Sequence, residues 1–298
     1  MTKTAFYSVA GHRFSLTLPD SGTLWQALGQ YDPFVVQEGE TLFGLDLCGP
    51  ISTEGSEVAY DAPTEDGETV VRLLKIGKDW IFEIAPDHRK PVCARMLVKD
   101  DFSHGRLHLE NDLLSDAVFG INNAVMLLYA FRTSALDTLE MHASVILNNG
   151  KAFLFLGKSG TGKSTHSRLW LNHIPGSELM NDDNPVVRVM DDGSVIAYGS
   201  PWSGKTPCYR NVSAPVGAFV RIRQDKGNRI IGMNVIEAYA ALYSSSSGFK
   251  ADRRMADGLH SSMEKIATST PFFTLFCRPD EEAARVCAEK VLNINGGR

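Results

Sequence analysis

Residues 141–165 read MHASVILNNGKAFLFLGKSGTGKST, and this stretch decides the fold of the second half of the chain. Its end matches the pattern G-x-x-x-x-G-K-[ST], with an apolar run over residues 152–156 before it and a helix-compatible run over residues 165–171 after it. A strand, a glycine-rich turn and a helix in this order form a loop whose backbone N–H groups point at phosphate oxygens. We therefore predict that the chain binds a nucleoside triphosphate.

The residues of this loop have separate roles in holding a triphosphate. The predicted binding residues are Gly157, Lys158, Ser159, Gly160, Thr161, Gly162, Lys163, Ser164 and Thr165. Glycines allow the backbone to turn where other residues are strained, and the following helix adds its positive end. Lys163 supplies a charge to the β- and γ-phosphates, and the Ser164 hydroxyl is suited to ligate Mg²⁺. ATP and Mg²⁺ are the expected cofactors, although such a loop contacts phosphates and not the base.

A hairpin is predicted immediately before the loop. The sequence Asn-Asn-Gly at residues 148–150 separates two apolar runs, and Asn-Gly between such runs is a strong hairpin signal. The strand beside the loop strand should therefore be antiparallel to it. If Leu147 lies opposite Lys151, His142 lies opposite Leu156 and its imidazole reaches the phosphate site. The alternative is a surface histidine at the end of a strand.

An aspartate pair, Asp182 and Asp183, follows a short apolar run about twenty residues after the loop. Two adjacent carboxylates allow one to contact Mg²⁺ while the other accepts a proton from an attacking hydroxyl. The alternative is an ordinary loop, because Asn, Asp and Pro are turn residues. A second pair, Asp191 and Asp192, lacks the strand context and predicts a hairpin turn.

The segment at residues 199–207 is rich in turn formers but also contains Trp202 and Lys205. It is either a loop that closes over a ligand or a loop pinned by a buried tryptophan. Arg210 lies just beyond it, and we predict that Arg210, with Lys205 as an alternative, neutralises charge on a transferred phosphoryl group. His166 is expected to be structural or exposed.

Composition predicts a soluble globular protein with one large domain or two ordinary ones. Hydrophobic residues make up 43% and charged residues 22% of the 298 residues, which is enough to bury a full core. We predict a β-rich region over residues 1–110, a bridging helix over 111–138 and a catalytic domain over 139–298. The catalytic domain should be α/β (α+β) with a mixed sheet, because several connections are too short for crossover helices.

Charge and cysteine content exclude several classes of function. The net charge of −5 argues against broad binding to nucleic acid or to anionic membranes. The five cysteines are odd in number and none has CxxC spacing, which favours reduced thiols over disulfides or a zinc site. The N-terminus lacks an apolar signal core, and no stretch approaches 18 uncharged apolar residues. A cytoplasmic location is therefore expected.

Taken together, these motifs resemble two related families. Met-His-Ala-Ser at residues 141–144, the loop at 157–165 and Asn-Asp-Asp at 181–183 follow the order and spacing of HPr kinase/phosphorylase and of the ATP-dependent phosphoenolpyruvate carboxykinases. The likeness spans residues 139–223 and extends more loosely to the C-terminus. It implies a carboxykinase-like P-loop kinase domain, with His142 and the aspartates at the metal and the phosphoacceptor.

The resemblance also implies roles for single residues. In HPr kinase an aspartate of the pair acts as base on a serine hydroxyl, so Asp182 or Asp183 is expected to do so here. In the carboxykinases a histidine matching His142 binds a metal, so the role of His142 differs between the two families. An arginine before a Ser-x-Pro segment in the carboxykinases resembles Arg210 ahead of residues 213–215.

The departures from both families shape the expected activity. The chain is much shorter than a carboxykinase and lacks that family's substrate-binding arginine and tyrosine motifs. The HPr kinase signature loop is replaced by Pro-Trp-Ser-Gly at residues 201–204. The resemblance therefore implies an ATP- and Mg²⁺-dependent kinase acting on a hydroxyl, with serine of a protein, peptide or small molecule as the expected acceptor, and a homo-oligomer as HPr kinase-like proteins often form. Two alternatives are a nucleotide-binding sensor without chemistry and phosphoryl transfer to a small carboxylate or enol.

Overall fold

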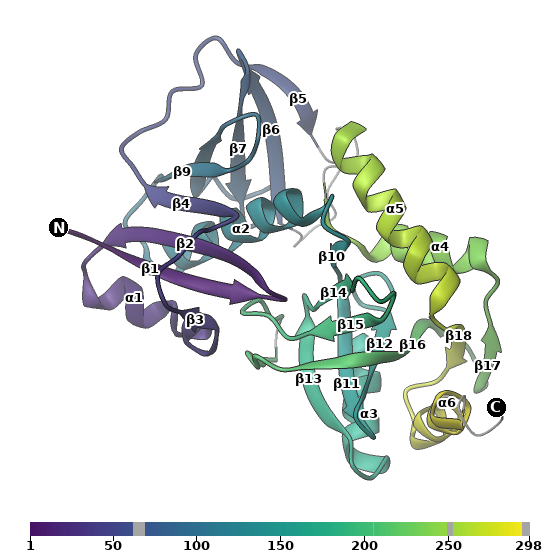
Figure 1. The fold of residues 1–298 in the computed structure, drawn as a ribbon. Helices are drawn as coiled ribbons and strands as arrows, with labels where there is room; N and C mark the ends of the chain where they lie inside the picture. The colour runs from purple at the N-terminus through teal and green to yellow at the C-terminus, as the bar shows by residue number, and fades with distance from the viewer. Residues whose placement is uncertain (62–68, 205, 249–252, 294–298) are drawn as a thin grey trace. The chain divides into compact units, whose positions relative to one another are not determined.

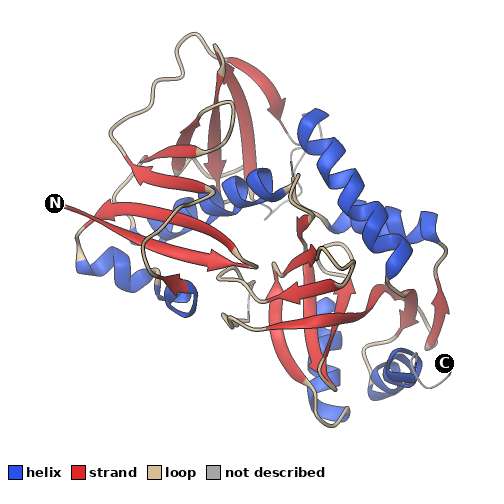
Figure 2. Ribbon diagram, in the orientation of Figure 1, coloured by secondary structure: helices blue, strands red, loops and turns tan. Residues whose placement is uncertain are grey.

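The computed structural model describes residues 1–61, 69–204, 206–248 and 253–293. It is a mixed α and β protein with two mixed sheets (Figures 1 and 2). The chain divides into two compact units, Met1–Arg132 and Thr133–Arg298. The sequence predicted a bridging helix as a separate segment over residues 111–138. In the structure this helix, Leu114–Thr133, lies almost wholly in the first unit.

Unit 1 is built on one mixed sheet with the strand order β3-β1-β2-β4-β9-β8-β7-β6-β5. Within it β2, β4 and β9 are parallel neighbours, and the other neighbours are antiparallel. The strands are β1 (Thr2–Val9), β2 (His12–Pro19), β3 (Val35–Val36), β4 (Phe43–Leu47), β5 (Glu57–Asp61), β6 (Val70–Ile76), β7 (Asp79–Ala85), β8 (Ala94–Val98) and β9 (His104–Leu109). Two short helices, α1 (Gly22–Ala27) and the 3₁₀ helix η1 (Gly29–Phe34), connect β2 to β3.

Helix α2 (Leu114–Thr133) is the core helix of unit 1. The hydroxyl of Tyr129 donates a hydrogen bond to the Val9 carbonyl at 3.1 Å, and the rings of Phe131 and Phe102 lie 4.8 Å apart. By length and a mean hydropathy of 1.3, α2 is apolar enough to span a membrane, but half of that span is buried inside the protein. Its apolar side chains are thus accounted for by packing within the unit, as in the core helix of a folded domain.

Unit 2 carries a second mixed sheet with the order β10-β14-β15-β16-β12-β11-β13, to which β18 adds along β16 and β17 along β18. The strands are β10 (Thr138–Glu140), β11 (Ala143–Asn148), β12 (Lys151–Leu156), β13 (Glu178–Asp183), β14 (Val186–Val189), β15 (Val195–Tyr198), β16 (Ser213–Gln224), β17 (Arg229–Gly232) and β18 (Phe272–Cys277). Strand β12 is antiparallel to β11 and parallel to β16. The predicted mixed sheet is confirmed.

Helices cover both faces of the sheet of unit 2. They are α3 (Lys163–His173), α4 (Val235–Ser245), α5 (Arg253–Ser269) and α6 (Glu281–Leu292). Alternate residues of β12 belong to two separate cores, one shared with α4 and α5 and one shared with α3 and α6. A strand that is buried on both faces reads as a continuous apolar run, which explains the sequence AFLFL at residues 152–156.

The β-rich region predicted over residues 1–110 contains two hairpins with short turns. One is formed by β1 and β2 around Gly11, and the other by β6 and β7 around residues 77–79. The sequence HGRLHL of β9 has two histidines and an arginine among its six residues. Because this pattern is weak, the strand was not predicted from the sequence. It forms because β9 pairs with both β4 and β8.

Candidate functional site

The glycine-rich loop joins the end of β12 to the start of α3. Its glycines Gly157, Gly160 and Gly162 have φ of 152°, 76° and 104°, which other residues rarely adopt. The carbonyl of Lys158 accepts hydrogen bonds from the backbone N–H of Thr161 at 3.2 Å and from its hydroxyl at 2.8 Å. The predicted turn is thus formed, and α3 begins directly after it at Lys163, where the first N–H groups of a helix have no partner within the helix.

The ammonium group of Lys163 is held at the centre of this loop. Its Nζ donates to the carbonyl oxygens of Gly157 at 3.0 Å and Lys158 at 3.4 Å. Burial lowers the pKa of Lys163 below its ordinary value, while the negative charges of Asp183 and Asp182 act against that shift. A bound anion would have the same effect as these carboxylates, because it favours the charged form of the lysine.

Strands β11 and β12 form the predicted hairpin. The Asn-Gly turn at residues 149–150 has φ of 50° and 72°, as a type I′ turn requires. The predicted register is wrong by one residue, because Leu147 lies opposite Ala152 and not opposite Lys151. The turn consists of two residues, Asn149 and Gly150, and Asn148 already pairs with Lys151. His142 therefore lies level with Gly157, the first glycine of the loop, and not with Leu156 as predicted.

Strand β13 brings the aspartate pair alongside β11. Asp183 lies opposite Ala143, and Asp182 lies opposite Ser144. The Nε2 atom of His142 is 3.3 Å from Oδ1 of Asp183. Asp182 is only 4% exposed, whereas Asp183 is more open and has φ of 138°. Positive φ is uncommon for a residue other than glycine and is found at constrained functional positions.

The segment at residues 199–204 is held against the aspartate pair. The backbone N–H of Gly204 donates to the carbonyl of Asp182 at 2.7 Å, and Ser203 forms a β-bridge with Asp183. Trp202 is 3% exposed, and its carbonyl accepts a hydrogen bond from the Asn181 amide at 3.0 Å. The segment is therefore pinned by a buried tryptophan, the second of its two predicted roles, and it also forms one edge of the site.

These elements surround a cavity of about 470 Å³. Most of the residues predicted for the site line it together: His142, Ser159, Gly160, Gly162, Lys163, Ser164, Thr165, Asp182 and Asp183, with Arg168, Gly204 and Thr206. The other predicted residues of the loop, Gly157, Lys158 and Thr161, shape its backbone without lining this cavity. The structure thus gathers cationic, anionic and hydroxyl groups around one space.

Arg210 is not brought to this cavity. Its guanidinium donates to the Leu179 carbonyl at 2.6 Å and to the Glu178 carboxylate at 2.9 Å, near the start of β13. The arginine that lines the cavity is Arg168, which the sequence reading missed. Helical spacing was the available signal, because a residue four positions after Ser164 lies on the same side of α3. Lys205, the alternative to Arg210, lies outside the described residues.

The cavity is compatible with Mg²⁺, although no dedicated metal site is formed. Among the described residues no three His, Cys, Asp or Glu side chains come together as a ligand set. Mg²⁺ usually takes one or two protein ligands and fills its other positions with waters and substrate phosphates. Ser164, Asp182 and Asp183 line the same cavity as the loop, and they fit that arrangement.

Sequence reasoning missed a buried carboxyl group that interacts electrostatically with Asp183. Glu140, the last residue of β10, is 2% exposed, and neither carboxyl oxygen has a hydrogen-bond partner among the described residues. Burial, with a smaller contribution from the charge of Asp183, raises the pKa of Glu140 from 4.5 to about 8. The group is thus neutral over much of the physiological range.

The raised pKa of Glu140 predicts a specific dependence of stability on pH. The folded state holds this proton more tightly than the unfolded state, so its contribution is fully present below pH 4.5 and is lost as pH rises through about 8. Each pKa unit corresponds to about 1.4 kcal/mol, so we expect the free energy of unfolding to fall by a few kcal/mol over this range. Glu140→Gln should flatten the dependence in urea unfolding curves.

A matched control is Glu289→Gln on the exposed side of α6, which should leave the pH dependence of the wild type in place. If Glu140→Gln kept the wild-type slope, then Glu140 would be ionised in the folded protein.

Comparison with known proteins gives no family assignment: no protein-family model and no curated protein matches the sequence.

Proposed function

We propose that the chain is an ATP- and Mg²⁺-dependent kinase that transfers the γ-phosphoryl group to a hydroxyl, with a serine of a protein, peptide or small molecule as the expected acceptor. The observation that carries the proposal is the single cavity that collects the phosphate loop, Lys163, Ser164, His142 and the aspartate pair. A loop for binding alone does not require a carboxylate and an imidazole in contact at its open end, whereas transfer to a hydroxyl does.

The donor side of the reaction belongs to the loop. Lys163 and the free N–H groups at the start of α3 bind the β- and γ-phosphates. The Ser164 hydroxyl and Asp182 would hold Mg²⁺, since Asp182 is the more buried of the pair. Mg²⁺ held by these residues would offset the negative charge that develops on the transferred phosphoryl group. Arg168 lies on the same wall and adds positive charge.

The acceptor side belongs to Asp183 and His142. Asp183 accepts the proton of the substrate hydroxyl while the hydroxyl oxygen forms a bond to the γ-phosphorus. The bond between the γ-phosphorus and its bridging oxygen breaks, and ADP leaves with the bonding electrons. His142, 3.3 Å from Asp183, orients the carboxylate. Catalysis here depends on position and electrostatics more than on covalent chemistry of the protein.

The fold is proposed to be the carboxykinase-like P-loop type, preceded by a β-rich N-terminal domain. Two features support this: the loop strand β12 has an antiparallel neighbour in β11, and the aspartate pair ends β13 on the far side of β11. A cytoplasmic location is proposed as well, because it agrees with the use of ATP as the phosphoryl donor. The acceptor is the expected partner, and a homo-oligomer remains part of the proposal.

The proposal is tested by transfer of label from ATP. Purified protein is incubated with Mg²⁺, a cell lysate and ATP labelled on the γ-phosphate, and the products are separated by size. We expect one labelled acceptor, which is lost with Asp183→Asn and with Lys163→Ala. Tight ATP binding without label transfer under any condition would contradict the kinase and favour a nucleotide-binding sensor.

A further inference from the structure

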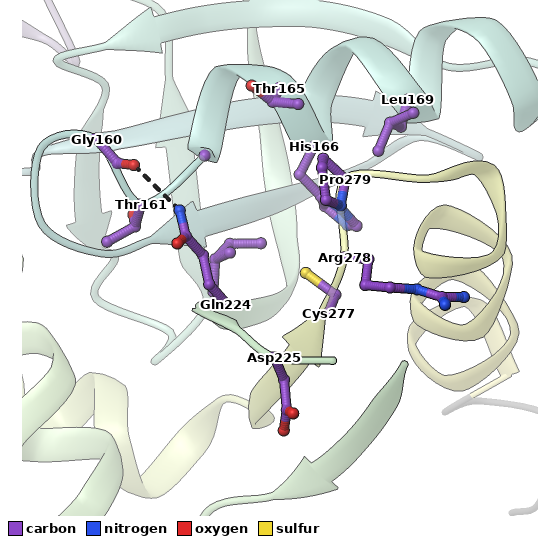
Figure 3. Close-up of a pocket in the computed structure, with 12 residues that line it drawn as sticks. Gly160, Thr161, Thr165, His166, Leu169, Gln224, Asp225, Cys277, Arg278 and Pro279 are labelled. Atoms are coloured by element: carbon purple, nitrogen blue, oxygen red, sulfur yellow. Dashed lines mark hydrogen bonds between the residues drawn. The ribbon is translucent and has the colours of Figure 1, made fainter. Parts of the chain in front are cut away.

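A second cavity, of about 430 Å³, lies on the other side of the phosphate loop (Figure 3). It shares Gly160, Gly162 and Thr165 with the first cavity. The two cavities therefore meet at the loop. If the loop holds the phosphates of a ligand in the first cavity, the part of the ligand that carries no phosphate is close enough to enter the second.

The walls of the second cavity are suited to an uncharged group. Leu169, Ile222 and Pro279 contribute apolar surface. The charged residues in the wall are already paired: Asp225 with Arg229 at 2.6 Å, and Arg278 with acidic residues at the start of α6 at 2.9 and 3.2 Å. In Figure 3 the Arg278 side chain extends toward the neighbouring helix. Paired charges of this kind give no preference for a further phosphate.

One polar group in this wall has no partner. His166 on α3 is 2% exposed, and its Nδ1 is buried without a hydrogen-bond partner among the described residues. Its Nε2 lies 3.1 Å from Nε1 of Trp170. An indole N–H can only donate, so Nε2 must be the acceptor and the proton of the imidazole must be on Nδ1. The ring is held in place by Phe155, with centroids 4.7 Å apart.

The unpartnered N–H calls for an acceptor. A buried donor without a partner destabilises a protein, and Nδ1 of His166 cannot turn away, because the hydrogen bond to Trp170 and the contact with Phe155 orient the ring. The bases and sugars of nucleosides carry neutral acceptor nitrogen and oxygen atoms on flat or compact rings. They match both the apolar walls and the single donor.

We propose that the second cavity receives the nucleoside of the donor nucleotide and that Nδ1–H of His166 donates a hydrogen bond to it. This inference rests on the proposed function, because it takes the ligand of the loop to be a nucleoside triphosphate. His166 is then a residue that distinguishes a nucleotide from a bare polyphosphate. Lys163 and the loop bind both.

Calorimetric titration with Mg·ATP and with Mg·tripolyphosphate separates the nucleoside from the phosphates. The wild type should bind ATP more tightly than tripolyphosphate. His166→Gln keeps an amide near the Nε2 position but loses the donor at Nδ1, and we expect about a fivefold to tenfold loss of ATP affinity with tripolyphosphate unchanged. His166→Asn places an amide near the Nδ1 position and should retain most of the ATP affinity.

Filling the cavity provides a variant that does not alter His166. Leu169→Trp should lower ATP affinity more than tenfold and leave tripolyphosphate binding as in the wild type, because the added ring occupies the nucleoside space. Circular dichroism and melting curves confirm that each variant is folded.

The outcomes separate this inference from the proposed function. Equal affinities of the wild type for ATP and tripolyphosphate would overturn the nucleoside site while leaving phosphate binding intact. Equal losses for both ligands in His166→Gln would assign His166 a structural role only. If the wild type bound neither ligand, the proposed function itself would fail.

Discussion

Lys163→Ala is expected to weaken binding of Mg·ATP by about 30-fold to several thousand-fold, because removal of one partner from a buried, charge-assisted contact costs about 2–5 kcal/mol. Lys163 is the cation at the centre of the loop, where its Nζ donates hydrogen bonds to two loop carbonyls. Ligand binding stabilises the folded state by RT ln(1 + [L]/Kd), so weaker binding gives a smaller rise in melting temperature at the same ligand concentration. Stabilisation by Mg·ATP should therefore disappear in this variant in a thermal-shift titration.

The control is Lys151→Ala, at the other end of β12 from the loop, which should respond to Mg·ATP like the wild type. Circular dichroism checks that both variants are folded without ligand, because Lys163 is buried and its loss removes two hydrogen bonds to the loop. Undiminished stabilisation of Lys163→Ala by Mg·ATP would place the triphosphate somewhere other than this loop.

Asp183→Asn should reduce phosphoryl transfer by about 10²- to 10⁴-fold, the range associated with loss of a general base. ATP affinity should change little, because the proposed role of Asp183 is toward the acceptor and Asp182 remains to hold Mg²⁺. The variant is suited to the position, since asparagine has nearly the shape of aspartate and tolerates positive φ better than most residues. Rates are measured with labelled ATP and the acceptor found in the lysate, under single-turnover conditions.

The chain offers a matched control in its second aspartate pair. Asp191→Asn removes the same charge from an exposed turn between β14 and β15, and it should leave transfer unchanged. If Asp183→Asn transferred phosphate at the wild-type rate while Asp182→Asn did not, the base would be Asp182 and the assigned roles would be exchanged.

Short-range patterns were sufficient for the parts of the site that form within one segment. The loop follows from glycines that must take positive φ, and the hairpin follows from an Asn-Gly pair that adopts a type I′ turn. The one-residue error in register shows the limit of this reasoning. Asn148 pairs with Lys151 as the last rung of the ladder, and apolar patterning alone does not reveal where a ladder ends.

The two arginines illustrate what sequence order does not reveal. Arg210 follows the turn-rich segment and was expected in the site, yet its guanidinium is taken up by Glu178 and the Leu179 carbonyl. Arg168 lies in the cavity because α3 begins at the loop and carries one side of its first turns into it. Nearness in sequence predicted the wrong arginine, since an extended segment and a helix carry their side chains in different directions.

Local sequence thus specified the phosphate loop, the hairpin beside it and the antiparallel neighbour that this hairpin gives the loop strand, because each depends on backbone preferences and turn chemistry within a few residues. Long-range packing settled the rest. It placed His142 against Asp183, buried Glu140 without a partner, and opened a second cavity between α3 and the end of β18. These features depend on strands and helices far apart in the chain, whose pairing is decided by the burial of shared apolar surface and not by any one segment.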